Sequence, residues 1–157
     1  MNDLINLVLV DAIWSALAAI GFAMIFNVPR RTLLACALTG AAGHAMRALL
    51  IHFGMNIVPA TMLGGSVIGF VGEYWSHRLH APPLLFTVSG AIPMVPGSFA
   101  YRAMLGAIRI STADATSGMP ILVDAGINFA TTGLLLAALA LGIVTPQLLF
   151  RRKAKAS

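Results

Sequence analysis

Three charged residues lie inside apolar stretches, where an ionisable side chain is costly and usually faces a partner or a water-filled cavity. These residues are Asp11, Arg47 and Asp124. At about 1.5 Å per helical residue, each lies roughly 10 Å from the outer end of its predicted span. One cation and two carboxylates in one layer predict either a polar or proton-coupled vestibule on the periplasmic side or a structural ion pair that lets Arg47 stay buried.

A second feature is the segment Pro93-Met94-Val95-Pro96-Gly97-Ser98, which interrupts an otherwise apolar helical pattern. Two prolines and a glycine predict a break, and an unwound segment at membrane depth must be covered by protein or line a polar cavity. Ser98 is placed to cap the helix that follows, whose free N–H groups favour an anion. We expect a site for a small carboxylate, although a plain proline kink is the structural alternative. The predicted binding residues are Pro93, Pro96, Gly97, Ser98, Arg47, Arg102 and Asn128.

Other polar residues share helical faces with these groups. Asn128 follows Asp124 by one helical turn and precedes Thr131 and Thr132, so this face either lines a solute pathway or bonds to neighbouring helices. Glu73 and His77 are also one turn apart, which predicts either a proton relay or an interfacial anchor. The predicted proton-coupling residues are Asp11, His44, Glu73 and Asp124.

Composition indicates that membrane-spanning helices position these residues. The chain has 157 residues, of which 59% are hydrophobic and 10% charged, against about 25% charged in a soluble domain. Hydropathy and helix breakers predict an all-α polytopic protein with five spans, the fourth broken at Pro93–Gly97. The spans are expected at about 4–27, 32–53, 59–79, 83–108 and 118–150. They form one transmembrane domain, 1–150, followed by a basic tail, 151–157.

The distribution of cations predicts the orientation of the spans. Five spans place seven lysines and arginines on one side and two, Arg102 and Arg109, on the other. Cytoplasmic loops carry the excess of Lys and Arg, so we expect the C-terminal tail in the cytoplasm. The seven are Arg30, Arg31, Arg78, Arg151, Arg152, Lys153 and Lys155.

Several function classes receive no support from the residue pattern. The histidines and carboxylates do not form a metal-ligand motif, and no nucleophile elbow, phosphate loop or dinucleotide fingerprint is present. We therefore expect no enzyme activity, no metal and no cofactor. The net charge of +5 arises from cations at span ends, which argues against nucleic-acid binding. Gly40 and Gly43, together with the glycines of the third span, predict close helix packing.

Two segments of the chain resemble the threonine/serine exporter family. They are the break, Pro93-Met94-Val95-Pro96-Gly97, and the end of the first span, Phe26-Asn27-Val28-Pro29-Arg30-Arg31. The similarity is to the C-terminal half of that family and covers nearly the whole chain. Some family members are one long polypeptide, and others are split into a larger and a smaller subunit. This chain resembles the small subunit of the split type, that of a succinate exporter pair.

The resemblance implies a multi-pass protein of the bacterial inner membrane that works with a larger multi-span subunit in a hetero-oligomer surrounded by lipid. It implies export of small carboxylates, with succinate first and threonine or serine as the alternative. A non-transporting scaffold subunit and a passive channel are further alternatives. Of the family motif, only Pro93, Pro96 and Gly97 are mapped onto this sequence.

Overall fold

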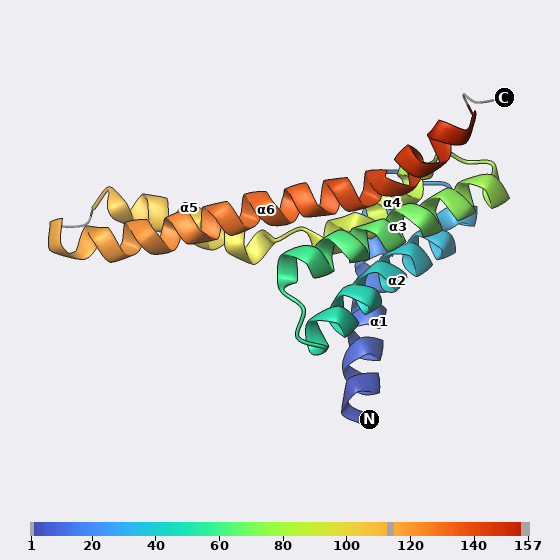
Figure 1. Ribbon diagram of the computed structural model, residues 1–157. Helices are drawn as coiled ribbons and strands as arrows, with labels where there is room; N and C mark the ends of the chain where they lie inside the picture. The colour runs from blue at the N-terminus through green and yellow to red at the C-terminus, as the bar shows by residue number, and fades with distance from the viewer. Residues whose placement is uncertain (1, 113–114, 155–157) are drawn as a thin grey trace. The chain divides into compact units, whose positions relative to one another are not determined.

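The computed structural model describes the main chain of residues 2–112 and 115–154 and the side chains of residues 4–112 and 118–149. Every regular element within these residues is helical, which confirms the all-α class (Figure 1). The elements are α1 (Asn2–Ile25), η1 (Arg30–Thr32), α2 (Leu33–His52), α3 (Ile57–Leu79), α4 (Pro83–Ala91), η2 (Ile92–Met94), α5 (Gly97–Ile110) and α6 (Ala115–Ala154).

The membrane-spanning character predicted from the sequence is confirmed. Among the described residues, four helical segments are long and apolar enough to cross a membrane, and the broken pair 83–94 and 97–110 is a fifth if it counts as one span. The break falls between Met94 and Gly97, inside the predicted segment. Helix α6 has 40 residues, or about 60 Å, which is about twice the thickness of a hydrocarbon core.

The chain packs as two compact units, and α6 contributes to both. Unit 1 contains Met1–Met94 and Ala138–Ser157, and unit 2 contains Val95–Ala137. The expected single domain, 1–150, stays a prediction. Of the expected basic tail, residues 151–154 continue α6 as main chain, and residues 155–157 lie outside the described part of the chain.

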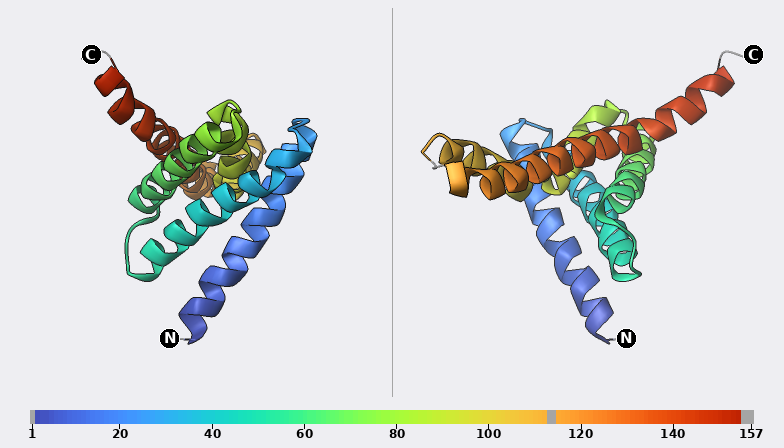
Figure 2. Two further views of the ribbon diagram at one scale, coloured as in Figure 1. Left: turned by 90° about the vertical axis from the view of Figure 1, so that its right-hand side faces the viewer. Right: turned by 60° about the vertical axis from the view of Figure 1, so that its left-hand side comes forward.

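Helix α2 is the central helix of unit 1 and contacts α1, α3 and α4 (Figures 1 and 2). Two small apolar clusters fill the spaces between the helices. The first contains Ala23, Val28, Ala35, Cys36 and Phe86. The second contains Ile68, Ala91, Met94 and Leu139, so the last residue before the break is part of the core.

Glycines allow these helices to approach closely, as the sequence predicts. A Cβ added at Gly43 would collide with the Ile68 side chain, and one added at Gly64 would lie 2.9 Å from the carbonyl oxygen of Gly43. At Gly69 an added Cβ would lie 2.5 Å from the carbonyl oxygen of Ile143 in the part of α6 that belongs to unit 1. The expected small-residue packing of the second and third spans is therefore confirmed.

Left-handed residues end three of the helices. Asn27, Gly54 and His80 have φ values of 55°, 86° and 49°. After α1, Val28 N–H donates to the Ala23 carbonyl and Asn27 N–H to the Met24 carbonyl, both at 3.0 Å. This Schellman arrangement satisfies carbonyls that a helix end leaves free.

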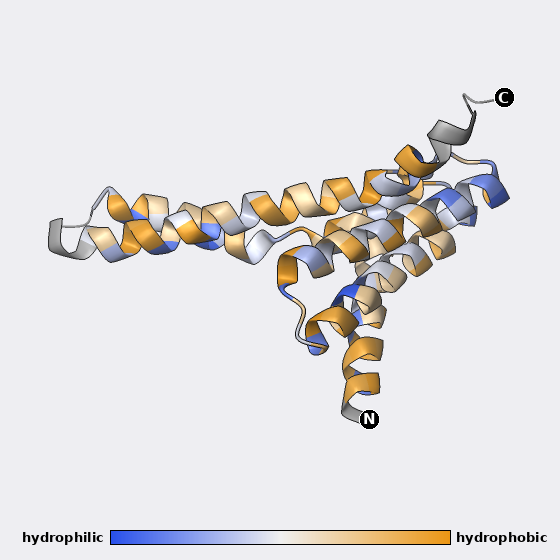
Figure 3. Cartoon of the chain, in the orientation of Figure 1, coloured by the Kyte–Doolittle hydropathy of each residue, from blue (hydrophilic) through white to orange (hydrophobic). Residues whose placement is uncertain are grey.

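The outer surface is strongly apolar. Figure 3 shows hydrophobic residues along most of the length of the helices. Large apolar side chains such as Leu34, Phe53 and Ile25 are each at least 70% exposed. A surface of this kind requires lipid or other helices around it.

Unit 2 is a pair of helices, α5 and the first part of α6. A Cβ added at Gly106 would lie 2.6 Å from the Cβ of Ala125, so the two helices approach closely. Between them is an apolar cavity of about 510 Å³ whose wall includes Ala103, Met104 and Phe129.

Candidate functional site

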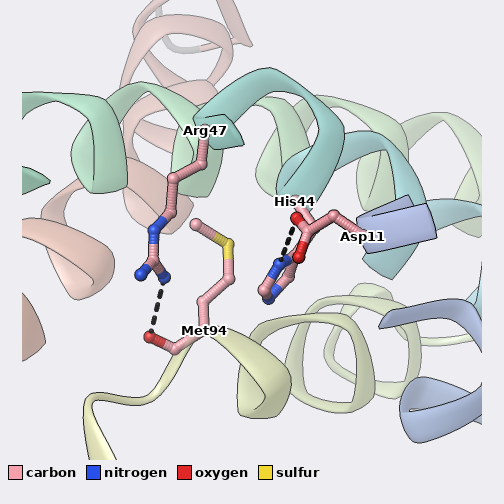
Figure 4. A network of polar contacts seen from close by, with 4 residues as sticks. All are labelled: Asp11, His44, Arg47 and Met94. Carbon is pink, nitrogen blue, oxygen red and sulfur yellow. Dashed lines mark hydrogen bonds and ion pairs between the residues drawn. The ribbon is translucent and has the colours of Figure 1, made fainter. Parts of the chain in front are cut away.

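A polar network in unit 1 joins α1, α2 and the break. The Nδ1 atom of His44 lies 3.1 Å from the Oδ2 atom of Asp11, and the Nη1 atom of Arg47 donates to the Met94 carbonyl oxygen at 3.3 Å (Figure 4). Asp11 comes from α1, His44 and Arg47 from α2, and Met94 from η2. The sequence places Asp11, His44 and Arg47 among the site residues, and the structure brings these three together.

Helical spacing explains how α2 presents both of its groups. His44 and Arg47 are three residues apart and therefore lie on one face of the helix. The His44 side chain is only 13% exposed, whereas that of Asp11 is 41% exposed. The Nε2 atom of His44 is buried and has no hydrogen-bond partner among the described residues.

The pairing differs from the expected ion pair between Arg47 and a carboxylate. Among the described residues, Asp11 forms its close pair with His44, and its negative charge acts on Arg47 from a longer distance. Arg47 instead binds a main-chain carbonyl at the end of the broken half-helix. The last carbonyls of a helix lack helical partners, and a cation there also interacts favourably with the helix dipole. A main-chain partner leaves no signal in side-chain types, which is why sequence reasoning missed it.

A cavity of about 800 Å³ opens beside the network, within the size range of small-molecule sites. Asp11, His44 and Arg47 all lie in its wall. Sequence reasoning did not select the other polar wall residues, Asn6 and His52, because neither shares an obvious pattern with a partner. The remaining wall residues are Leu7, Val10, Trp14, Ala48 and Ile51.

The break has a defined local geometry. Pro96 has φ −77° and ψ 59°, and the Gly97 N–H donates to the Val95 carbonyl at 2.8 Å, which is an inverse γ-turn. A Cβ added at Gly97 would meet nothing within 4 Å. The packing of this chain therefore does not require glycine at that position.

The expectation that Ser98 caps the following helix is wrong. Helix α5 begins at Gly97, Pro96 is the N-cap residue, and no side chain bonds to the helix start. The γ-turn brings the chain into helical geometry two residues earlier than expected, so Ser98 lies inside the first turn. The Pro96 carbonyl accepts the first helical bond, from Ala100 N–H at 3.1 Å.

The remaining predicted site residues of the C-terminal part belong to unit 2. Arg102 and Asp124 are exposed and Asn128 is buried. The Asn128 amide donates to the Asp124 carbonyl at 2.8 Å, and the Thr132 hydroxyl donates to the Asn128 carbonyl at 2.8 Å. These side chains therefore bond to their own helix. It stays a prediction that these three predicted site residues, Arg102, Asp124 and Asn128, approach the site formed by Asp11, His44 and Arg47.

Glu73 and His77 form a pair, as their spacing predicts, with Nε2 and Oε1 3.2 Å apart. The His77 side chain is 79% exposed. Nearby, the Arg78 guanidinium lies 5.8 Å from the centre of the Tyr74 ring, and Tyr74 contacts Trp75 edge to face. Exposed pairs and aromatic residues at a helix end are typical of an interfacial anchor.

No group of three or more His, Cys, Asp or Glu side chains that could hold a metal ion occurs among the described residues. The chemistry available at the cavity is that of one guanidinium, one carboxylate and two imidazoles. Such a set can bind a charged organic solute and can exchange a proton.

Comparison with known proteins agrees with these features. The family model described as "Threonine/Serine exporter, ThrE" matches residues 11–149. An uncharacterized protein of Haemophilus influenzae is 42% identical over 148 residues, which are 92% of this chain and 48% of that protein. The chain thus spans about half the length of this relative. No solved structure matches. With nearly the whole chain inside the family match and a break within an apolar helical bundle, the chain belongs to the threonine/serine exporter (ThrE) family of membrane transporters.

Proposed function

We propose that this chain is the small subunit of a secondary exporter for small carboxylates in the bacterial inner membrane. The observation that carries the proposal is Arg47, which lies in the wall of a solute-sized cavity and also binds the end of the broken helix. Its guanidinium has five N–H donors in a fork that suits a carboxylate, and one of them is used on Met94. The Arg47 side chain can therefore contact both a solute in the cavity and the broken helix, and broken helices form solute sites in transporters.

The charges on the cavity wall favour a zwitterionic amino acid as the solute. Arg47 suits a carboxylate, and the half-exposed carboxylate of Asp11 suits an ammonium group while repelling a second carboxylate. The family description also favours threonine and serine. Succinate, which the sequence resemblance puts first, is the second candidate, because His52 supplies another cation on the same wall when protonated.

A larger multi-span subunit is the proposed partner. The chain covers 48% of the Haemophilus influenzae relative, and we propose that the partner corresponds to the part of that relative that lies outside the matched region. The apolar exterior of the chain supports this inference, because helices with small, apolar surfaces pack against other helices in lipid.

The broken segment is the proposed moving element. Met94 belongs to the core of unit 1, whereas unit 2 begins at Val95, so the break connects two separately packed parts of the chain. Short segments at element ends are where transporter hinges absorb backbone change. Solute binding at Arg47 would compete for the donors that hold Met94 and thereby affect the break.

Export assays test the proposal in cells that carry this chain and the partner. Labelled L-threonine, L-serine and succinate are loaded separately, and the initial rate of release is measured. We expect Arg47→Ala and Gly97→Leu to reduce release of the true solute at least about tenfold, which corresponds to about 1.4 kcal/mol. Gly21→Leu is the matched control, because a Cβ at Gly21, as at Gly97, would meet nothing within 4 Å.

The alternatives give different outcomes in the same assay. If both variants assemble with the partner and export normally, the chain acts as a scaffold and the proposed site is wrong. If the labelled solute still moves both into and out of the cells after the proton gradient is dissipated, the assembly is a passive channel.

A further inference from the structure

We propose that Asp11 and His44 form the proton-binding site of this carrier, and that a proton on His44 disfavours the conformation described here. That this site couples proton movement to export rests on the proposed export function. That it binds a proton depends only on the close approach of a carboxylate, a buried imidazole and the broken helix (Figure 4).

The two ring nitrogens of His44 have different surroundings. Nδ1 lies 3.1 Å from the Asp11 carboxylate, whereas Nε2 is buried without a partner among the described residues. An ionised carboxylate only accepts hydrogen bonds, so Nδ1 carries the hydrogen in this pair. A neutral imidazole then has a lone pair on Nε2, and no N–H is left without an acceptor.

Protonation of His44 changes the hydrogen bonds that its ring requires. The imidazolium has an N–H on both nitrogens, and the Nε2–H would have no acceptor in the present packing. A buried donor without an acceptor destabilises the fold, and more strongly when it is charged. Proton binding therefore favours a different conformation, in which Nε2–H reaches an acceptor.

The charged groups around His44 connect it to the break. Asp11 on α1 faces it, Arg47 lies one turn along α2, and His52 lies on the same cavity wall. Neither α4 nor η2 carries a titratable side chain, and neither does the part of α6 from 138 to 149. The titratable side chains of α3 lie in its last turns, outside the cavity wall.

A proton on His44 adds a cation one turn from Arg47, and like charges at this spacing repel each other. Because Arg47 holds the Met94 carbonyl, this repulsion acts on the end of the broken helix. Protonation thus disfavours the described packing at two points, the unpaired Nε2 and the Arg47–Met94 bond.

The pair at Glu73 and His77 lacks these properties. The His77 side chain is 79% exposed, so both of its nitrogens can be hydrated in either charge state. A change in its charge therefore leaves no buried atom without a partner. This contrast favours Asp11 and His44 over Glu73 among the proton-coupling residues predicted from the sequence.

The experiment uses the full chain in lipid nanodiscs with ¹³C-labelled methionine methyl groups. Met94 is 1% exposed and reports on the break, and the Met94→Leu variant identifies its signal. Between about pH 8 and about pH 5, the range in which histidine titrates, we expect the Met94 signal to move or split in the wild type. The same transition should occur in the control His80→Gln, which removes an exposed histidine at the end of α3, and it should be absent in His44→Gln.

Asp11→Asn provides a second, more conservative variant, because the amide keeps an acceptor oxygen and removes the charge. We expect it to move the midpoint of the Met94 transition to lower pH, because the negative charge that faces Nδ1 of His44 is lost. A Met94 signal that does not respond to pH in the wild type, or that responds equally in His44→Gln, overturns the proposal. If His44→Gln does not fold, an unshifted midpoint in Asp11→Asn overturns it instead.

Export assays in the presence of the partner distinguish proton binding by Asp11 and His44 from the role of this pair in export. We expect the pH dependence of labelled threonine release to be lost in His44→Gln and kept in His80→Gln. Unchanged pH dependence in His44→Gln overturns the coupling role. If the wild type exports nothing, the proposed function fails, and the Met94 titration still decides whether the pair binds a proton.

Discussion

At the scale of residues, Arg47 and Asp11 do not pair with each other, and each bonds to a different group. Asp11 pairs with His44, and Arg47 bonds to the Met94 carbonyl. A guanidinium in a membrane span needs compensation for its lost hydration, and a free helix-end carbonyl supplies it. Arg47 therefore stabilises the break as well as lining the cavity.

Replacement of Arg47 by glutamine tests this structural role. The shorter amide leaves the Met94 carbonyl without its charged donor, so we expect a loss of about 1–3 kcal/mol in the free energy of unfolding. Thermal unfolding in detergent measures the change. Arg102→Gln is the control, since Arg102 is exposed and should contribute less than about 0.5 kcal/mol. Equal stability of the two variants would show that the bond to Met94 is not stabilising.

The exposed pair at the end of α3 gives a contrasting expectation. Glu73→Gln removes one charge from a pair whose histidine is largely solvent-accessible, and such pairs contribute about 0–1 kcal/mol. We therefore expect little change in unfolding temperature and unchanged export. A large loss of export in this variant would instead favour a proton relay at Glu73.

At the scale of elements, glycines decide how closely the helices pack. Gly142 of α6 faces α3 so closely that an added Cβ would collide with the Met62 carbonyl oxygen. Main-chain atoms cannot rotate away as a side chain can, so the two helices would have to separate. Gly133, on the same helix, has nothing within 4 Å of an added Cβ.

These two glycines form a matched pair of variants. We expect Gly142→Ala to destabilise the protein by about 1–3 kcal/mol, because it overpacks the contact between α3 and α6. Gly133→Ala should be neutral or stabilising by up to about 1 kcal/mol, because alanine favours helix more than glycine does. Unfolding of both variants in the same detergent measures the difference. A destabilised Gly133→Ala would point to an inter-subunit contact at that position.

At the scale of the whole molecule, the number of crossings remains the central prediction. In unit 1 the C-terminal end of α6 emerges on the same side as the α1–α2 and α3–α4 connections, opposite to the N-terminus of α1 (Figures 1 and 2). Those connections have Arg30, Arg31 and Arg78 near them, so the positive-inside rule predicts that this side is cytoplasmic.

Reporter fusions test this orientation. We expect a fluorescent protein fused to the C-terminus to be active in the cytoplasm, and a periplasmic phosphatase to be active only at the N-terminus. Opposite locations for the two ends require an odd number of crossings, so the broken pair would count as one span. Both ends on the same side would mean that residues 83–110 form a re-entrant loop.

The class of protein follows from the amino-acid sequence alone, because hydropathy over about 20 residues and the distribution of cations depend only on composition along the chain. The position of the break follows from the sequence as well, since proline and glycine act on their own main chain. The contacts between helices, in contrast, cannot be read from residue types and are known only from the folded arrangement. It paired Asp11 with His44, gave Arg47 a main-chain carbonyl as partner, and left the Nε2 atom of His44 buried without one. These contacts depend on how three helix faces meet in space, and no local pattern encodes that arrangement.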